Sequence, residues 1–187
     1  LLAAGKCRFE VGEFVQARIA LAAVTAIPKA AELAEASYWL ARTLVELKQA
    51  PQAVALLDAA VKAHAASPLL PQLVYARVEA LYAIEDRRAE TVAQFSGFAA
   101  KYPKHTLAAN AVYMASLAAL QVRQYDAART AAGVFLANQA WQKHALLPEV
   151  LNIGGQSWLR GEKPDLVKSE ALFRRIQSEF SKHVHAK

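Results

Sequence analysis

The spacing of apolar side chains in the middle of the chain predicts a helix, a turn and a second pair of helices. Phe95 and Phe98 lie three residues apart and therefore on one helical face, and the Tyr-Pro pair at 102–103 ends that helix. An Ala-rich apolar pattern over 108–120 starts the next helix, and the segment 125–128, Tyr-Asp-Ala-Ala, leads into another. The pattern predicts a helix-turn-helix unit.

The same alternation of small and bulky positions recurs along the chain. Equivalent small residues are separated by 36, 38, 37 and 41 positions, at Ala17, Ala53, Thr91, Ala128 and Ser169. Small residues are needed where paired helices cross closely, and bulky residues such as Phe95 fill the space toward the next pair, so both kinds are expected in the core. The sequence therefore predicts about five helix-turn-helix repeats in an all-α chain.

Ten helices are predicted, and prolines and aspartates mark several of their ends. Asp126 and Asp165 suit helix starts, Pro28 closes the second helix, and three further prolines (51, 71 and 148) suit first turns, where a missing N–H does no harm. The predicted ranges are about 1–10, 13–27, 30–48, 51–66, 69–85, 88–101, 105–122, 125–140, 146–160 and 165–181.

The repeats resemble those of tetratricopeptide-repeat (TPR) proteins over nearly the whole chain. The pattern of Gly5, Gly12, Phe14 and Ala17 has the TPR spacing in the first repeat, although the period exceeds the usual value of about 34 residues. Glu79 and Ser116 stand where TPR repeats usually have Gly or Ala. The resemblance implies a right-handed α-solenoid, a single TPR-like domain over 1–187, whose concave face binds a peptide or protein segment.

The segment 95–128 is also similar to the bacterial cell-envelope branch of TPR proteins. That branch includes the lipoprotein of the outer-membrane β-barrel assembly machine and the coordinator protein of the Tol-Pal system. It carries Phe-x-x-Phe, Tyr-Pro, an Ala-rich helix and Tyr-x-x-Ala, which match Phe95, Phe98, residues 102–103 and 125–128. This resemblance implies a role in envelope assembly and favours the periplasm or cell envelope over the cytoplasm.

Composition supports a helical, packed chain. Of 187 residues, 55% are hydrophobic and 42 are Ala, whereas Gly and Pro number only 7 each. No apolar run approaches the roughly 18 residues that would span a bilayer. Leu1 opens within a predicted helix without an initiator Met, so we expect a fragment of a longer chain whose terminal repeats are covered by further sequence or by self-association.

No group of residues suggests catalysis. Ser157 and the five histidines lack a nucleophile elbow, and no Gly-rich loop suits a phosphate, so we expect a protein that is not an enzyme and binds no cofactor. The pair 154–155, Gly-Gly, is interpreted as close helix packing. His183 and His185 could meet a metal, but the sequence shows no third ligand, so no metal site is predicted.

The first helix of each TPR pair lines the concave face, and its inward positions are the candidate site. The expected partner-binding residues are Tyr38, Arg42, Asn110, Tyr113, Leu117, Asn152 and Gln156. On the helix predicted over 69–85 the inward positions are Leu73, Ala76, Ala80 and Ala83. Aromatic anchors and amides of this kind suit a peptide, although both tyrosines could instead pack between helices.

The net charge of +6 raises a nucleic-acid alternative. The expected groove carries three cations and four carboxylates, whereas a phosphate track should be consistently basic, so nucleic acid is disfavoured as a partner. The groove cations are Lys6, Arg42 and Arg160, and the carboxylates are Glu10, Glu35, Glu46 and Glu149. The leading hypothesis is a non-catalytic interaction scaffold, and the alternatives are a nucleic-acid-binding helical repeat or a regulatory domain of a larger enzyme.

Overall fold

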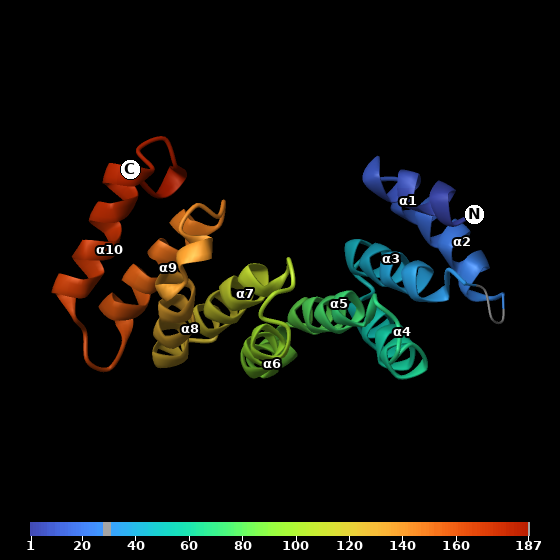
Figure 1. The fold of residues 1–187 in the computed structure, drawn as a ribbon, viewed down its shortest axis with the longest axis horizontal. Coiled ribbons are helices and arrows are strands. Elements are labelled where there is room, and N and C mark those ends of the chain that lie inside the picture. The colour runs from blue at the N-terminus through green and yellow to red at the C-terminus, as the bar shows by residue number, and fades with distance from the viewer. Residues whose placement is uncertain (28–30, 187) are drawn as a thin grey trace. The chain divides into compact units, whose positions relative to one another are not determined.

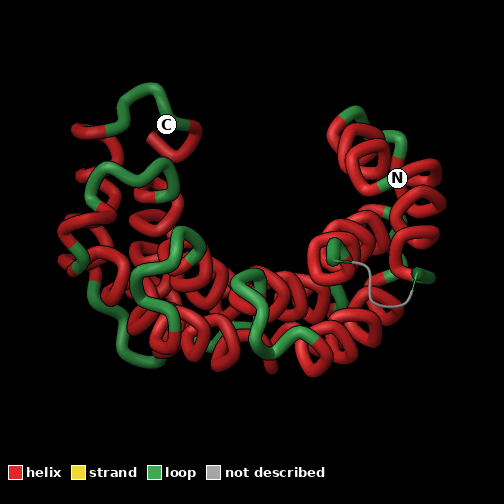
Figure 2. Tube along the Cα trace, turned by 45° about the vertical axis from the view of Figure 1, so that its right-hand side comes forward, coloured by secondary structure: helices red, strands yellow, loops and turns green. Residues whose placement is uncertain are grey.

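The computed structural model describes residues 1–27 and 31–186, and every regular element within them is helical (Figures 1 and 2). The α-helices are α1 Leu2–Glu10, α2 Phe14–Thr25, α3 Leu33–Glu46, α4 Ala50–Ala63, α5 Leu70–Tyr82, α6 Arg88–Lys101, α7 Ala108–Gln121, α8 Tyr125–Ala137, α9 Leu147–Arg160 and α10 Leu166–Glu179. Three short 3-10 helices are η1 Glu85–Arg87, η2 Gln139–Trp141 and η3 Val184–Ala186. The ten predicted helices are all present, with ends within three residues of the prediction. Pro28 and the predicted start of the third helix at residue 30 lie outside the described residues.

The helices form two compact units, Leu1–Arg88 and Ala89–Lys187. In unit 1, each helix from α1 to α4 packs on the next one along the chain, and α3 also packs on α1 and α5. In unit 2, α7 to α10 pack in the same order, and α7 also contacts α9. Thus the first helices of successive pairs lie next to one another within each unit. The prediction of one domain over 1–187 stays a prediction.

Helix starts are fixed by local hydrogen bonds that recur between repeats. The backbone N–H groups of Leu69, Leu107 and Leu146 donate to Ser67 Oγ, His105 Nδ1 and His144 Nδ1 at 3.2, 3.1 and 3.2 Å. Each acceptor lies two residues before its donor, so it satisfies an N–H that has no partner within the helix. The three prolines lie in first helical turns as predicted.

The two predicted aspartate starts have different outcomes. Asp165 caps α10, because its carboxylate accepts from the backbone N–H of Lys168 at 2.9 Å. Asp126 is the second residue of α8 and lies in its first turn, and the N-cap of this helix is Gln124. Asp126 therefore lies at the start of α8, which begins at Tyr125 as predicted, but it is not the capping residue.

In three of the turns that join paired helices, the residue at the same repeat position has a left-handed backbone conformation. Gly12, Lys48 and Arg123 have φ of 80°, 61° and 61°, and each lies five residues before a small core position. The first is a glycine, for which this conformation carries no Cβ penalty, whereas Lys48 and Arg123 adopt it against that penalty.

The small and bulky positions of the repeat pattern form the core as predicted. The five small residues Ala17, Ala53, Thr91, Ala128 and Ser169 are all buried, as are Phe95 and Phe135. The glycine pair in α9 marks close packing, because a Cβ on Gly155 would lie 2.7 Å from the ring of Phe173 and one on Gly154 3.0 Å from Leu172 Cδ1. Here α9 and α10 approach too closely for larger residues.

Candidate functional site

In unit 1 the candidate residues Tyr38 and Arg42 belong to a group of aromatic rings on α1 and α3. We call Phe9, Tyr38, Trp39 and Arg42 the Arg42 cluster. The Arg42 guanidinium carbon lies 4.8 Å from the ring centre of Phe9, 5.0 Å from that of Trp39 and 5.6 Å from that of Tyr38. The Trp39 ring meets Phe9 and Tyr38 edge-on, with centroids 5.3 and 5.4 Å away. The guanidinium is thus held by cation–π contacts on a half-buried surface.

A pocket of about 160 Å³ lies beside the Arg42 cluster, between α3 and α5. This α3–α5 pocket is lined by Ala41, Arg42, Val45, Glu46, Ala76 and Glu79. Burial raises the pKa of Glu79 to about 7, while the positive charge of Arg42 and a hydrogen bond with Tyr75 act in the opposite direction. Near neutral pH the pocket therefore changes charge with small changes of acidity.

The inward register predicted for α5 is wrong at two positions. Leu73 and Ala80 are fully buried, because α5 packs on both α3 and α4, and Ala83 is exposed at the end of the helix. Ala76 does line the pocket, together with Glu79, which the prediction left out. One feature of the sequence could have indicated that Glu79 lines a pocket: it is a carboxylate at a position where TPR repeats usually have a small residue.

In unit 2 the candidate residues lie on the two neighbouring helices α7 and α9, and all five are half-buried. On α7, Tyr113 and Leu117 pack against apolar core residues, so each is partly structural. On α9, the Gln156 amide donates to Asn152 Oδ1 at 3.1 Å, which aligns the two amides along the helix. Tyr38 and Tyr113 belong to different units, and a groove common to both stays a prediction.

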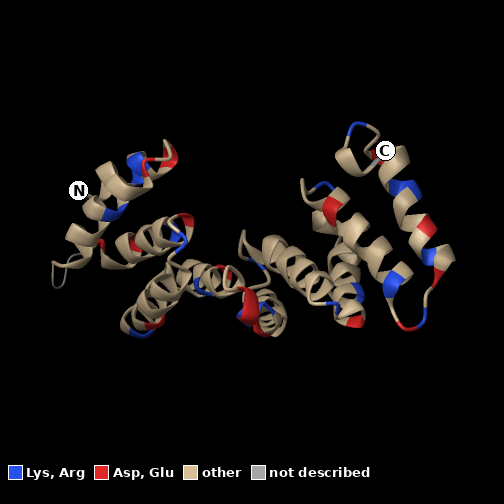
Figure 3. Cartoon of the chain, turned by 180° about the vertical axis from the view of Figure 1, so that it is seen from behind, with Lys and Arg blue, Asp and Glu red and all other residues tan. Residues whose placement is uncertain are grey.

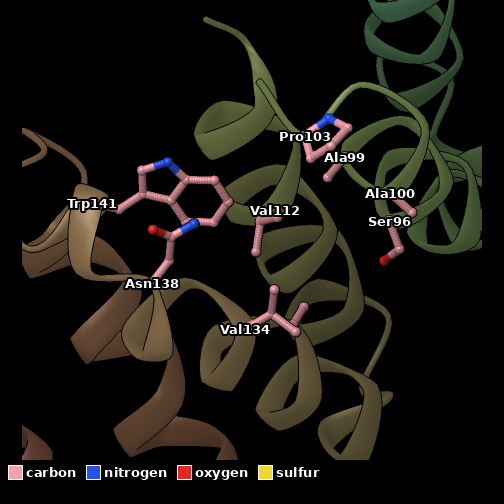
Figure 4. Close-up of a pocket in the computed structure, with 9 residues that line it drawn as sticks. Ser96, Ala99, Ala100, Pro103, Val112, Val134, Asn138 and Trp141 are labelled. Carbon is pink, nitrogen blue, oxygen red and sulfur yellow. The ribbon is translucent and has the colours of Figure 1, made fainter. Parts of the chain in front are cut away.

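The sequence interpretation missed an apolar pocket of about 330 Å³ within unit 2 (Figure 4). Val112 and Val134 lie between Trp141 and Asn138 on one side and Pro103 with residues of α6 on the other (Figure 4). Its volume is at the lower end of the roughly 300–1,000 Å³ typical of small-molecule sites, and its walls could take an apolar side chain.

Charges of both signs are interleaved along the helices of each unit, and α7 has no charged residue (Figure 3). Among the expected groove cations, Lys6 Nζ lies 2.6 Å from the Glu35 carboxylate. That pairing leaves less net positive charge on this part of the surface, and the expectation that nucleic acid is disfavoured stays a prediction.

Comparison with known proteins identifies the fold. No protein-family model matches the chain, and no curated protein sequence matches it either. Among solved structures, the nearly identical TPR-like repeats assigned to a kinesin light chain of Podosopora anserina superpose with a TM-score of 0.75, over 97% of this chain and 95% of that chain at 17% identity. A variant of those repeats, in which one Gln is replaced by Met, gives the same TM-score at 18% identity. The chain has a TPR-like solenoid fold.

The predicted fold class, an all-α solenoid of helix-turn-helix repeats, is therefore confirmed. At this level of identity the likeness shows the fold and nothing about partners. In the part of the chain that the structure describes, no helix is both long and apolar enough to cross a membrane.

Proposed function

We propose that the chain is a non-catalytic protein-interaction scaffold that binds a peptide or protein segment on the surfaces of its first helices. The observation that carries this proposal is the Arg42 cluster with the adjoining α3–α5 pocket. Both are formed by the first helices of successive pairs, and Arg42 belongs to both. The TPR-like fold supports the proposal, because such repeats commonly present a surface of this kind to a protein.

The geometry of the α3–α5 pocket suits one side chain of a partner. Its volume of about 160 Å³ is below that of typical small-molecule sites, so a peptide side chain fits it better than a metabolite. The aromatic rings already hold the guanidinium in place, so a carboxylate or backbone carbonyl of the partner would meet a donor that loses little freedom on binding.

The α7 and α9 surface of unit 2 adds groups that suit an extended backbone. Asn110 and the Asn152–Gln156 amide pair offer donors and acceptors, and Tyr113 supplies a half-buried aromatic neighbour. The similarity of residues 95–128 to the envelope branch of TPR proteins extends the proposal to bacterial envelope assembly, with localisation in the periplasm or cell envelope.

Peptide selection followed by affinity measurement tests the proposal. A random-peptide phage library is selected against the whole chain, and a labelled selected peptide is titrated by fluorescence anisotropy. We expect Arg42→Gln and Tyr38→Ala each to weaken binding by about tenfold or more, as truncation of interface anchors does. The matched controls Arg18→Ala and Tyr125→Ala, on second helices, should bind as the wild type does. Equal affinity for all five proteins would refute the proposal.

A further inference from the structure

Three potential metal ligands from two distant parts of the chain meet within unit 2. Glu149 lies in the first turn of α9, whereas His183 and His185 follow α10, the latter within η3. Glu149 Oε1 lies 3.5 Å from His183 Nε2, and Glu149 Oε2 lies 2.8 Å from His185 Nε2. One ligand atom from each residue can be chosen such that all three lie within 4.8 Å of one another.

These distances suit a small divalent cation. Zinc binds imidazole nitrogen and carboxylate oxygen at about 2.0–2.2 Å, and tetrahedral bonds of that length place neighbouring ligand atoms roughly 3.3 Å apart. The two observed nitrogen–oxygen distances, 2.8 and 3.5 Å, lie on either side of that value. The two distances involve different oxygens of the same carboxylate, so small movements of the three side chains would bring one oxygen and two imidazole nitrogens around one ion.

The ligand types select the metal class. Two imidazoles with one carboxylate are a donor set for zinc and similar divalent transition metals, whereas calcium and magnesium prefer oxygen ligands alone. The three side chains are about 30% exposed, so water can reach a fourth coordination position. We propose that Glu149, His183 and His185 form a Zn²⁺ site that fastens the residues after α10 to α9.

Metal binding at His183 Nε2 would also change a hydrogen bond at the other ring nitrogen, Nδ1. His183 Nδ1 accepts a long hydrogen bond of 3.3 Å from the backbone N–H of His185. An imidazole that coordinates through Nε2 carries its proton on Nδ1, so His183 exchanges this long hydrogen bond for a coordinate bond.

The site would close a loop that contains most of α9 and all of α10. Since η3 already contacts both α9 and α10, the metal finds its ligands largely in place. If the metal binds the folded chain and not the unfolded chain, it raises the free energy of unfolding. Above Kd, this increase grows with the logarithm of the metal concentration. Zinc should therefore raise the Tm of the chain in a concentration-dependent way.

Calorimetric titration of Zn²⁺ into the tag-free, chelator-treated chain tests the assignment. We expect one ion per chain with a Kd of about 1 µM or tighter, together with a higher Tm. His183→Gln, His185→Gln and Glu149→Gln should each weaken binding by at least about tenfold and abolish the rise in Tm, because each removes one ligand. His64→Gln, which removes a half-buried imidazole elsewhere, is the matched control and should bind as the wild type does.

The three substitutions are at partly exposed side chains, and circular dichroism checks that each variant is folded. Absence of binding at 100-fold the expected Kd would overturn the proposal and leave the three side chains as a polar contact between the two segments. Binding that survives Glu149→Gln unchanged would also overturn it, since the carboxylate is the ligand that joins the two parts of the chain.

Discussion

Replacement of Glu79 by Gln should change how the stability of the chain depends on pH. The Glu79 carboxyl lies half-buried in the α3–α5 pocket, where burial raises its pKa from 4.5 to about 7 against the opposing effects of Arg42 and Tyr75. Gln has nearly the same shape and can still accept a hydrogen bond from Tyr75, but it cannot ionise. The substitution therefore removes one titration and little else.

The sign and size of the effect follow from the two pKa values. The folded state binds the Glu79 proton more tightly than the unfolded state, so the stability that this proton confers is fully present below about pH 4.5 and is lost as pH rises through about 7. Each unit of pKa corresponds to about 1.36 kcal/mol. Because the side chain keeps some contact with water, we expect the variant to gain roughly 2–3 kcal/mol over the wild type above pH 7.

Urea denaturation followed by circular dichroism between pH 4 and 8.5 measures this difference. The two unfolding free energies should agree near pH 4 and diverge steadily toward pH 8. Glu46→Gln, which removes an exposed carboxylate beside the same pocket, controls for the loss of one negative charge. Parallel curves for the wild type and Glu79→Gln, or a difference that grows toward acid, would refute the reasoning about the pocket.

Three further predictions concern the turns, the helix contacts and the division between core and groove. Lys48→Gly and Arg123→Gly should each stabilise the chain by up to about 1 kcal/mol in thermal melts, because both residues have a left-handed backbone that suits glycine. Gly155→Ala should destabilise the chain by roughly 1–3 kcal/mol, because the new Cβ would contact Phe173. Gly133→Ala has open space around its Cβ and should stabilise the chain by up to about 1 kcal/mol. Equal effects of the two substitutions in urea denaturation would contradict the packing argument. Phe95→Ala should cost roughly 3–5 kcal/mol as a cavity in the core, whereas Tyr38→Ala and Tyr113→Ala should lower Tm less and weaken the selected peptide about tenfold or more; tyrosine variants that melt as early as Phe95→Ala would show that both rings are structural.

Local patterns explain what could be predicted from the sequence. Helices have a period of 3.6 residues, and close helix crossings demand small side chains, so positions such as Ala53, Ala128 and Gly155 reveal the repeats without any knowledge of their neighbours. Proline in first turns and the Asp165 cap depend on adjacent residues only, which is why those predictions are confirmed.

The features that the sequence did not predict depend on contacts between distant segments. The Phe9 ring on α1 contacts the Arg42 guanidinium on α3, and Glu149 contacts His185, which lies 36 positions later in the chain. Local sequence spacing therefore predicts neither contact. The inward register predicted for α5 is wrong for the same reason. A pattern with one buried face places Leu73 and Ala80 in the groove, but α5 packs on both α3 and α4, and this packing buries both residues.

Photo-crosslinking with the selected peptide tests most directly whether partners bind the first helices. A photoreactive residue is placed at Glu46 of α3 or Asn110 of α7, and, for comparison, at the exposed positions Arg18 of α2 or Thr130 of α8. We predict that the peptide is captured from Glu46, Asn110 or both, and not from Arg18 or Thr130. Capture from Arg18 or Thr130 alone would contradict the account, because it would place the partner on the second helices.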